Sequence, residues 1–154
     1  MKKSIKKGLS FGLTSGIITT LGLMVGLNSS THSKNLVLGG ILIIAVADAL
    51  SDAFGMHMSE ESDEKNSTSQ VWEATLSTLL SKIIFALTFV VPVLLLELKT
   101  AIVVSVIWGF LLISLFSYYL AKQEKLKPWK VIGEHLLIAV IVVVLTQLIG
   151  SLVG

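Results

Sequence analysis

The sequence contains no cysteine, so it can form neither disulfides nor thiolate metal sites, and it has no cysteine nucleophile. Charged residues are also scarce, at 14% of the 154 residues, whereas soluble domains average about 25%. A phosphate-binding glycine loop, a serine-elbow pattern and a nucleophile–base set are missing as well. These absences argue against an enzyme. The lack of a basic surface with interleaved aromatic residues argues against nucleic-acid binding.

Long apolar runs are what the sequence does contain. Hydrophobic residues make up 53% of the chain, and they gather into runs of about 18–24 residues, close to the roughly 20 that cross a bilayer as a helix. The expected spans cover residues 9–27, 36–58, 74–96, 101–121 and 131–153. The sequence therefore predicts an all-α integral membrane protein, with five transmembrane helices forming a single domain in contact with the lipid bilayer.

The lysines predict how the chain crosses the membrane. The first apolar run follows a lysine-rich start, but it is longer than the usual 7–15 residues of a signal sequence and has no small-x-small cleavage site, so we expect it to be retained. Nine lysines lie on the side of the N-terminus and two on the other, which predicts a cytoplasmic N-terminus and an outside C-terminus. Residues 59–73 would form a short acidic cytoplasmic loop. The membrane would be the plasma membrane of a prokaryote or a vacuolar-type membrane of a eukaryote.

Two acids interrupt the second apolar run. Asp48 and Asp52 are four residues apart, so they share one face of a helix, and Met56 continues that face. A carboxylate at mid-membrane costs at least about 2.5–3.5 kcal/mol, which makes such an acid a functional hypothesis by default. Counting about 1.5 Å per residue places both acids in the same membrane layer as Ser15 and Lys82. The alternatives are a cation site with Lys82 as counter-charge, or a structural ion pair; the lysine stem could also extend to the interface.

The residues around this stretch offer metal ligands. Carboxylate oxygens with a thioether suit Fe²⁺ or Mn²⁺ better than Mg²⁺, and imidazole suits first-row metals. The candidate metal-binding residues lie in one continuous segment: Asp48, Asp52, Met56, His57, Glu60, Glu61, Asp63 and Glu64. For the loop acids, the alternative is a solvated linker without a binding role.

Two further polar features have both a functional and a structural interpretation. Glu134, beside His135, predicts either a proton relay, since histidine exchanges protons near neutral pH, or the cap of a helix start. Small and polar residues recur three or four positions apart in the first span, which predicts a helix-packing face that could also line a pathway in a homodimer: Ser15, Thr19, Gly22 and Gly26.

Motifs in three spans resemble one known family. The segment from Gly16 to Leu27 resembles the first-helix signature of the vacuolar iron transporter family, Asp-Gly-Leu-Val-Thr-Thr-Phe-Gly followed by Ala-Gly. Ala49-Leu50-Ser51, with Gly55 and Ser59, resembles its second-helix pattern Ala-Leu-Ser-Met-x-x-Gly-Glu-Tyr-x-Ser. The pairs Ile132-Gly133 and Ile149-Gly150 are similar to parts of its fifth helix.

The resemblance implies a transporter that exports Fe²⁺ or Mn²⁺ from the cytosol in exchange for protons, without a permanently bound cofactor. It also implies a homodimer whose pathway lies between helices 1 and 2 of both subunits. This chain departs from the pattern: Ser15 stands where the family has Asp, Asp52 where it has Met, and Met56 where it has Glu. The long metal-binding cytoplasmic helices are reduced to about a dozen loop residues. The alternative function is a membrane structural or assembly protein that keeps the fold without transport.

Overall fold

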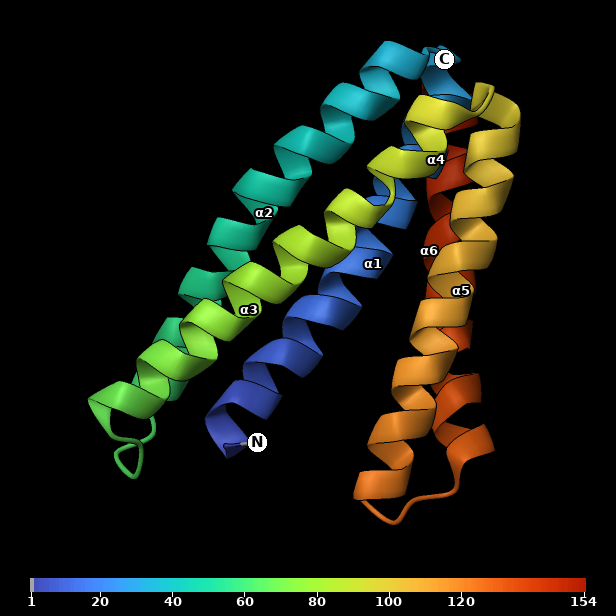
Figure 1. The fold of residues 1–154 in the computed structure, drawn as a ribbon. Coiled ribbons are helices and arrows are strands. Elements are labelled where there is room, and N and C mark those ends of the chain that lie inside the picture. The colour runs from blue at the N-terminus through green and yellow to red at the C-terminus, as the bar shows by residue number, and fades with distance from the viewer. Residues whose placement is uncertain (1) are drawn as a thin grey trace. The chain divides into compact units, whose positions relative to one another are not determined.

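The computed structural model describes residues 2–154, which form helices joined by short turns (Figure 1). Five helical stretches are long and apolar enough to cross a membrane, with α3 and α4 together forming the third. The predicted all-α, five-span membrane architecture is therefore confirmed. The helices are α1 (Lys3–Thr31), α2 (Lys34–Glu61), α3 (Thr68–Thr88), α4 (Val90–Leu95), α5 (Leu98–Gln123) and α6 (Pro128–Val153).

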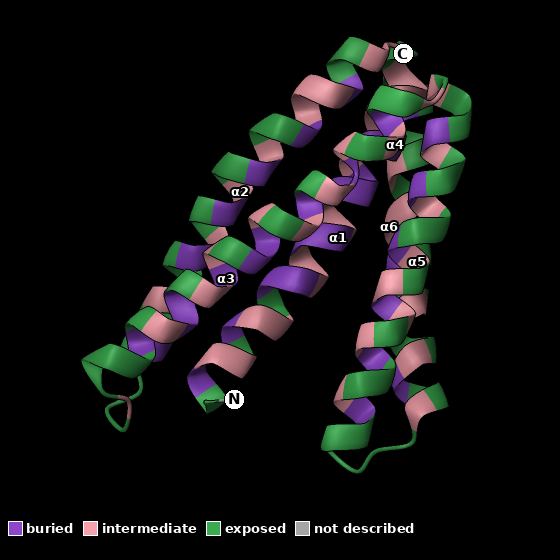
Figure 2. Ribbon diagram, viewed as in Figure 1, coloured by how far each residue is buried: buried purple, intermediate pink, exposed green. Residues whose placement is uncertain are grey.

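The chain folds into two compact units. The first contains the described residues up to Thr20 together with Ile41–Val90, and the second contains Leu21–Gly40 together with Val91–Gly154. Helices α1 and α2 thus contribute to both units. Within the second unit, the buried residues of α5 recur every four positions and are mostly small, which lets its backbone approach α6 closely (Figure 2): Ala101, Ser105, Gly109, Ile113, Ser117 and Ala121.

The connection between α2 and α3 is shorter than the loop expected over residues 59–73. Helix α2 continues to Glu61, and α3 begins after the N-cap residue Ser67. A capping box fixes this start. The backbone N–H of Gln70 donates to Ser67 Oγ (3.4 Å), and the backbone N–H of Ser67 donates to Gln70 Oε1 (2.8 Å). The Ser-x-x-Gln pattern was present in the sequence, but hydropathy alone does not detect a polar first turn.

The third span is broken into α3 and α4 rather than forming one helix over 74–96. Pro92 has no N–H to donate to the carbonyl one turn earlier, and its ring crowds that turn. The chain responds with a tighter turn, in which the Phe89 amide donates to the Ala86 carbonyl at 3.2 Å. Helix α4 then continues to Leu95.

Three glycines hold α1 against α3 in the first unit. Gly8, Gly12 and Gly16 are four residues apart and lie along the face of α1 that contacts α3. A Cβ atom on Gly12 would collide with Ser81 and with the Thr78 backbone, and one on Gly16 would lie 3.0 Å from the Lys82 carbonyl oxygen. The glycines therefore set how closely the two backbones approach.

We predict opposite effects for the same substitution at two glycines of this unit. Gly12→Ala should lower the free energy of unfolding by about 1–3 kcal/mol, because the added methyl overfills the α1–α3 contact. Gly55→Ala, where nothing lies within 4 Å of the added carbon, should be neutral or stabilising by up to about 1 kcal/mol through helix propensity. Chemical unfolding of both variants in the same detergent measures the difference. Equal stabilities would contradict the proposed close contact.

Candidate functional site

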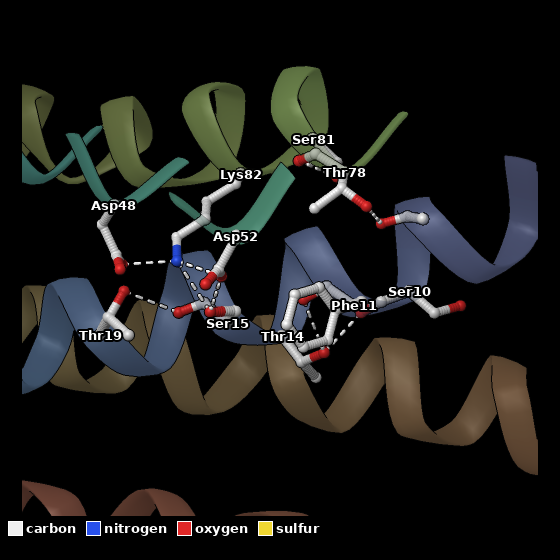
Figure 3. Close-up of polar contacts among 11 residues, drawn as sticks. Ser10, Phe11, Thr14, Ser15, Thr19, Asp48, Asp52, Thr78, Ser81 and Lys82 are labelled. Carbon is white, nitrogen blue, oxygen red and sulfur yellow. Dashed lines mark hydrogen bonds and ion pairs between the residues drawn. The ribbon is translucent and has the colours of Figure 1, made fainter. Parts of the chain in front are cut away.

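A buried lysine is the centre of the candidate site. Lys82 of α3 is only 1% exposed, and its ammonium group contacts carboxylates of α2 and a hydroxyl of α1 (Figure 3). Nζ lies 2.5 Å from Asp48 Oδ2, forms an ion pair with Asp52 Oδ2, and donates a hydrogen bond to Ser15 Oγ at 2.9 Å. The residues predicted to lie in one membrane layer are therefore in direct contact around the Lys82 ammonium. The lysine side chain does not extend to the membrane interface.

The two carboxylates are not equivalent. Asp52 Oδ2 accepts hydrogen bonds from Lys82 and from Ser15 Oγ, the latter at 2.6 Å. Asp48 Oδ2 has the same ammonium, 2.5 Å away, as its only polar contact among the described residues. The side chains of Asp48 and Asp52 keep exposed fractions of 30% and 21%. With all three groups ionised, the site carries two negative charges and one positive charge.

A second ion pair also joins α1 and α2, at some distance along the two helices from the lysine site. Ser15 contacts Asp52, and eight residues earlier on α1 and eight later on α2, Lys7 pairs with Glu60. Eight residues correspond to about 12 Å along a helix, so the two contacts lie about two turns apart on the same antiparallel seam. Met56, buried at 8% exposure, lies on α2 between Asp52 and Glu60.

The small-residue stripe predicted on the first span does not form a single surface. Ser15 belongs to the lysine site, whereas Thr19 donates its hydroxyl to the Ser15 carbonyl of its own helix at 2.8 Å. In the second unit, a Cβ on Gly22 would lie 2.8 Å from a Val142 methyl of α6, and one on Gly26 would lie 3.5 Å from the Thr146 carbonyl. These two glycines thus pack within the chain.

His57 lies at the end of α2 against α3. Its Nδ1 lies 3.1 Å from Thr75 Oγ1, and its ring meets Trp72 edge to face at 4.8 Å. The Thr75 hydroxyl already donates its proton to the Val71 carbonyl, so it can only accept from the histidine. This assigns the proton of the neutral ring to Nδ1 and leaves the lone pair on Nε2, which lies 4.0 Å from Glu61 Oε2.

The four acids predicted for a loop include the last two residues of α2, and they separate into one buried and three exposed residues. Glu60 is 4% exposed, paired with Lys7 and bound by the Asn66 amide at 3.2 Å. A cavity of about 100 Å³ opens beside this pair, with Lys3 and Asp63 also in its wall. Glu61, Asp63 and Glu64 are exposed to solvent. Across residues 2–154, no three His, Asp or Glu side chains gather where they could hold a metal ion.

The predicted relay pair lies in the second unit, and its two members face different neighbours. His135 Nδ1 is 2.7 Å from Ser117 Oγ of α5. The Glu134 side chain is 61% exposed and lies 4.0 Å from Lys130, one turn earlier on α6.

Sequence reasoning missed the polar contacts that fix the start of α1. Glu73 of α3 accepts hydrogen bonds from Lys2 and from Ser4, the latter at 2.6 Å. Ser4 is buried at 7% exposure although it lies in a lysine-rich segment. The only sign of these contacts in the sequence was Glu73 itself, an isolated acid in the first turns of α3.

The chain matches no known protein-family model and shows significant similarity to no curated protein. The resemblance to vacuolar iron transporters therefore depends on the helix motifs alone. The site brings together an ammonium, two carboxylates and a hydroxyl from three helices.

We predict that Lys82 stabilises the fold only while both aspartates are charged. Lys82→Met should lower the free energy of unfolding by up to about 3–5 kcal/mol, because it leaves two partly exposed carboxylates of a membrane span without a counter-charge. Adding Asp52→Asn should restore part of this loss. The measurement is a double-mutant cycle by chemical unfolding. If the two losses simply add, the residues do not interact as the structure indicates.

Proposed function

We propose that this protein is a membrane transporter that exports a divalent transition-metal cation, Fe²⁺ or Mn²⁺, from the cytosol in exchange for protons, as a homodimer. The observation that supports this proposal is the excess of carboxylate in the lysine site. Asp48 and Asp52 face a single ammonium, and charged groups inside a membrane span are costly, so an acid retained there is a functional hypothesis by default. A site with one uncompensated negative charge attracts a cation or a proton.

In this mechanism the Lys82 ammonium occupies the cation position until cargo arrives. An incoming cation displaces it and takes oxygen ligands from Asp48, Asp52 and Ser15. The Met56 thioether, one turn from Asp52 on the same helix, adds a ligand that transition metals accept and Mg²⁺ does not. Three oxygens do not fill the coordination of such a metal, so water or a second subunit supplies the rest. Protons that bind the carboxylates release the cation and allow the ammonium to return.

One observation favours the second candidate, a structural protein without transport. Lys82 is fully buried and already paired, and such an arrangement also stabilises a bundle whose charges never exchange. In that case the ion pair locks α1, α2 and α3 together and the site binds no cargo.

The variant Asp52→Asn distinguishes a transporter from a structural protein. The substitution keeps the size of the side chain but removes the charge, so metal flux into proteoliposomes should fall at least about tenfold. Asp48→Asn should be milder, because Asp48 contacts the ammonium alone whereas Asp52 also accepts from Ser15. Flux is measured across Fe, Mn, Co, Zn and Mg, and thermal stability is measured on the same purified variants. A destabilised Asn variant that still transports at the normal rate per folded molecule would assign Asp52 to structure.

The loop acids give a further prediction, in which Glu60 differs from its neighbours. Neutralising Glu61, Asp63 and Glu64 together should raise the half-saturating metal concentration by up to about tenfold at low ionic strength and leave the maximal rate unchanged, since exposed charges concentrate cations without binding them tightly. Glu60→Gln should instead reduce thermal stability, because it leaves Lys7 without its partner. An unchanged metal dependence in the triple variant would assign these acids to a solvated linker.

A further inference from the structure

The turn between α5 and α6 has a defined conformation. The Leu126 amide donates to the Ala121 carbonyl at 2.9 Å, and Lys125 has a positive φ of 54°. This is the hydrogen bond of a Schellman motif, in which glycine is the usual residue at the positive-φ position. A lysine there is strained relative to glycine. Lys125 therefore places a charged side chain at a position where the backbone geometry favours glycine.

The lysines of this turn differ from two of those at the start of the chain. Near the N-terminus, Lys2 pairs with Glu73 and Lys7 with Glu60, whereas Lys3 lines the cavity beside Glu60. Within residues 2–154, by contrast, neither Lys125 nor Lys127 has a hydrogen bond or ion pair to its side chain. Residues 118–134 contain four lysines and two glutamates. The α5–α6 turn therefore carries a positive charge that the fold does not neutralise.

Apolar side chains lie beside these charges. The residue after the positive-φ position normally packs back onto its helix, but Leu126 is 55% exposed, and Trp129 is 73% exposed. The Lys122 ammonium lies 5.6 Å from the ring centre of Tyr118, which is itself half exposed. An exposed combination of lysine, leucine, tryptophan and tyrosine at a helix end suits the headgroup region of a bilayer.

We propose that the α5–α6 turn, residues 118–130, is a binding site for anionic phospholipid headgroups. Lys125, Lys127 and Lys130 contact the phosphate, while Leu126 and Trp129 enter the acyl boundary beside it. Charge complementarity identifies the ligand, since a basic segment at the surface gains about 1 kcal/mol per lysine from anionic lipids, which is about fivefold in affinity. A topology signal alone needs the lysines but explains neither the strained Lys125 nor the exposed Leu126.

The test uses Trp129 as the reporter in the full chain. Trp72→Phe and Trp108→Phe leave one tryptophan, and its fluorescence is measured in bilayers with brominated phosphatidylglycerol or brominated phosphatidylcholine. We expect the anionic lipid to associate at least about fivefold more strongly at low salt, which is the gain from a single lysine. The preference should disappear when Lys125→Gly, Lys127→Gln and Lys130→Gln are combined. Equal quenching by the two lipids in the unsubstituted turn would overturn the proposal.

Two controls distinguish lipid binding from unfolding and from general charge loss. Lys125→Gly relieves the strained φ, so its thermal stability should be equal or higher while its lipid preference falls. Lys99→Gln removes an exposed lysine at the other end of α5 and should leave the quenching of Trp129 unchanged, whereas Lys127→Gln should reduce it. Inorganic phosphate at constant ionic strength should not displace the lipid. Displacement would identify free phosphate as the ligand and overturn the proposal.

Discussion

The ammonium of Lys82, held between two carboxylates inside a membrane span, is the interaction on which the first unit depends. Each of these charges alone would be costly in hydrocarbon. Together they are tolerable only if α1, α2 and α3 stay close enough for Ser15, Asp52 and Lys82 to touch. The electrostatic requirement therefore becomes a requirement on helix packing.

Glycine meets that packing requirement. Gly16 allows the backbone of α1 to approach Lys82 itself, and Gly8 and Gly12 continue the contact toward the start of α3. With larger residues on this face, the two helices would separate, and the Ser15 hydroxyl could not reach the ammonium. The buried residues of α5 repeat the same spacing, and Ser117 among them lies 2.7 Å from His135 of α6, so close small-residue contacts organise both units.

The sequence was sufficient to predict the spans and the membrane layer of the site, because helix rise converts position into depth. Asp48 and Asp52 share a face by periodicity alone, and Lys82 falls at their depth. Which neighbour each side chain meets was not predictable. Glu60 and Glu61 are adjacent in the same acidic run, yet only Glu60 turns inward to Lys7. The rotation of α2 against α1 decides this, and hydropathy along the sequence does not reveal that rotation.

The contacts of the lysines were not predictable from the sequence either, and these contacts matter for function. The rule that orients membrane proteins counts Lys7 and Lys127 alike, by their place along the chain, and leaves out Lys82 because it lies inside a span. Their surroundings give them different chemistry: Lys7 closes an ion pair beside the α2–α3 turn, Lys82 occupies a carboxylate site within the membrane, and Lys127 has no partner in the described chain. Neutralised lysines contribute little field, so a lipid surface responds mainly to unpaired ones. The α5–α6 turn, with Lys125 and Lys127 unpaired among the described residues, is the basic segment for which we propose binding to an anionic membrane surface.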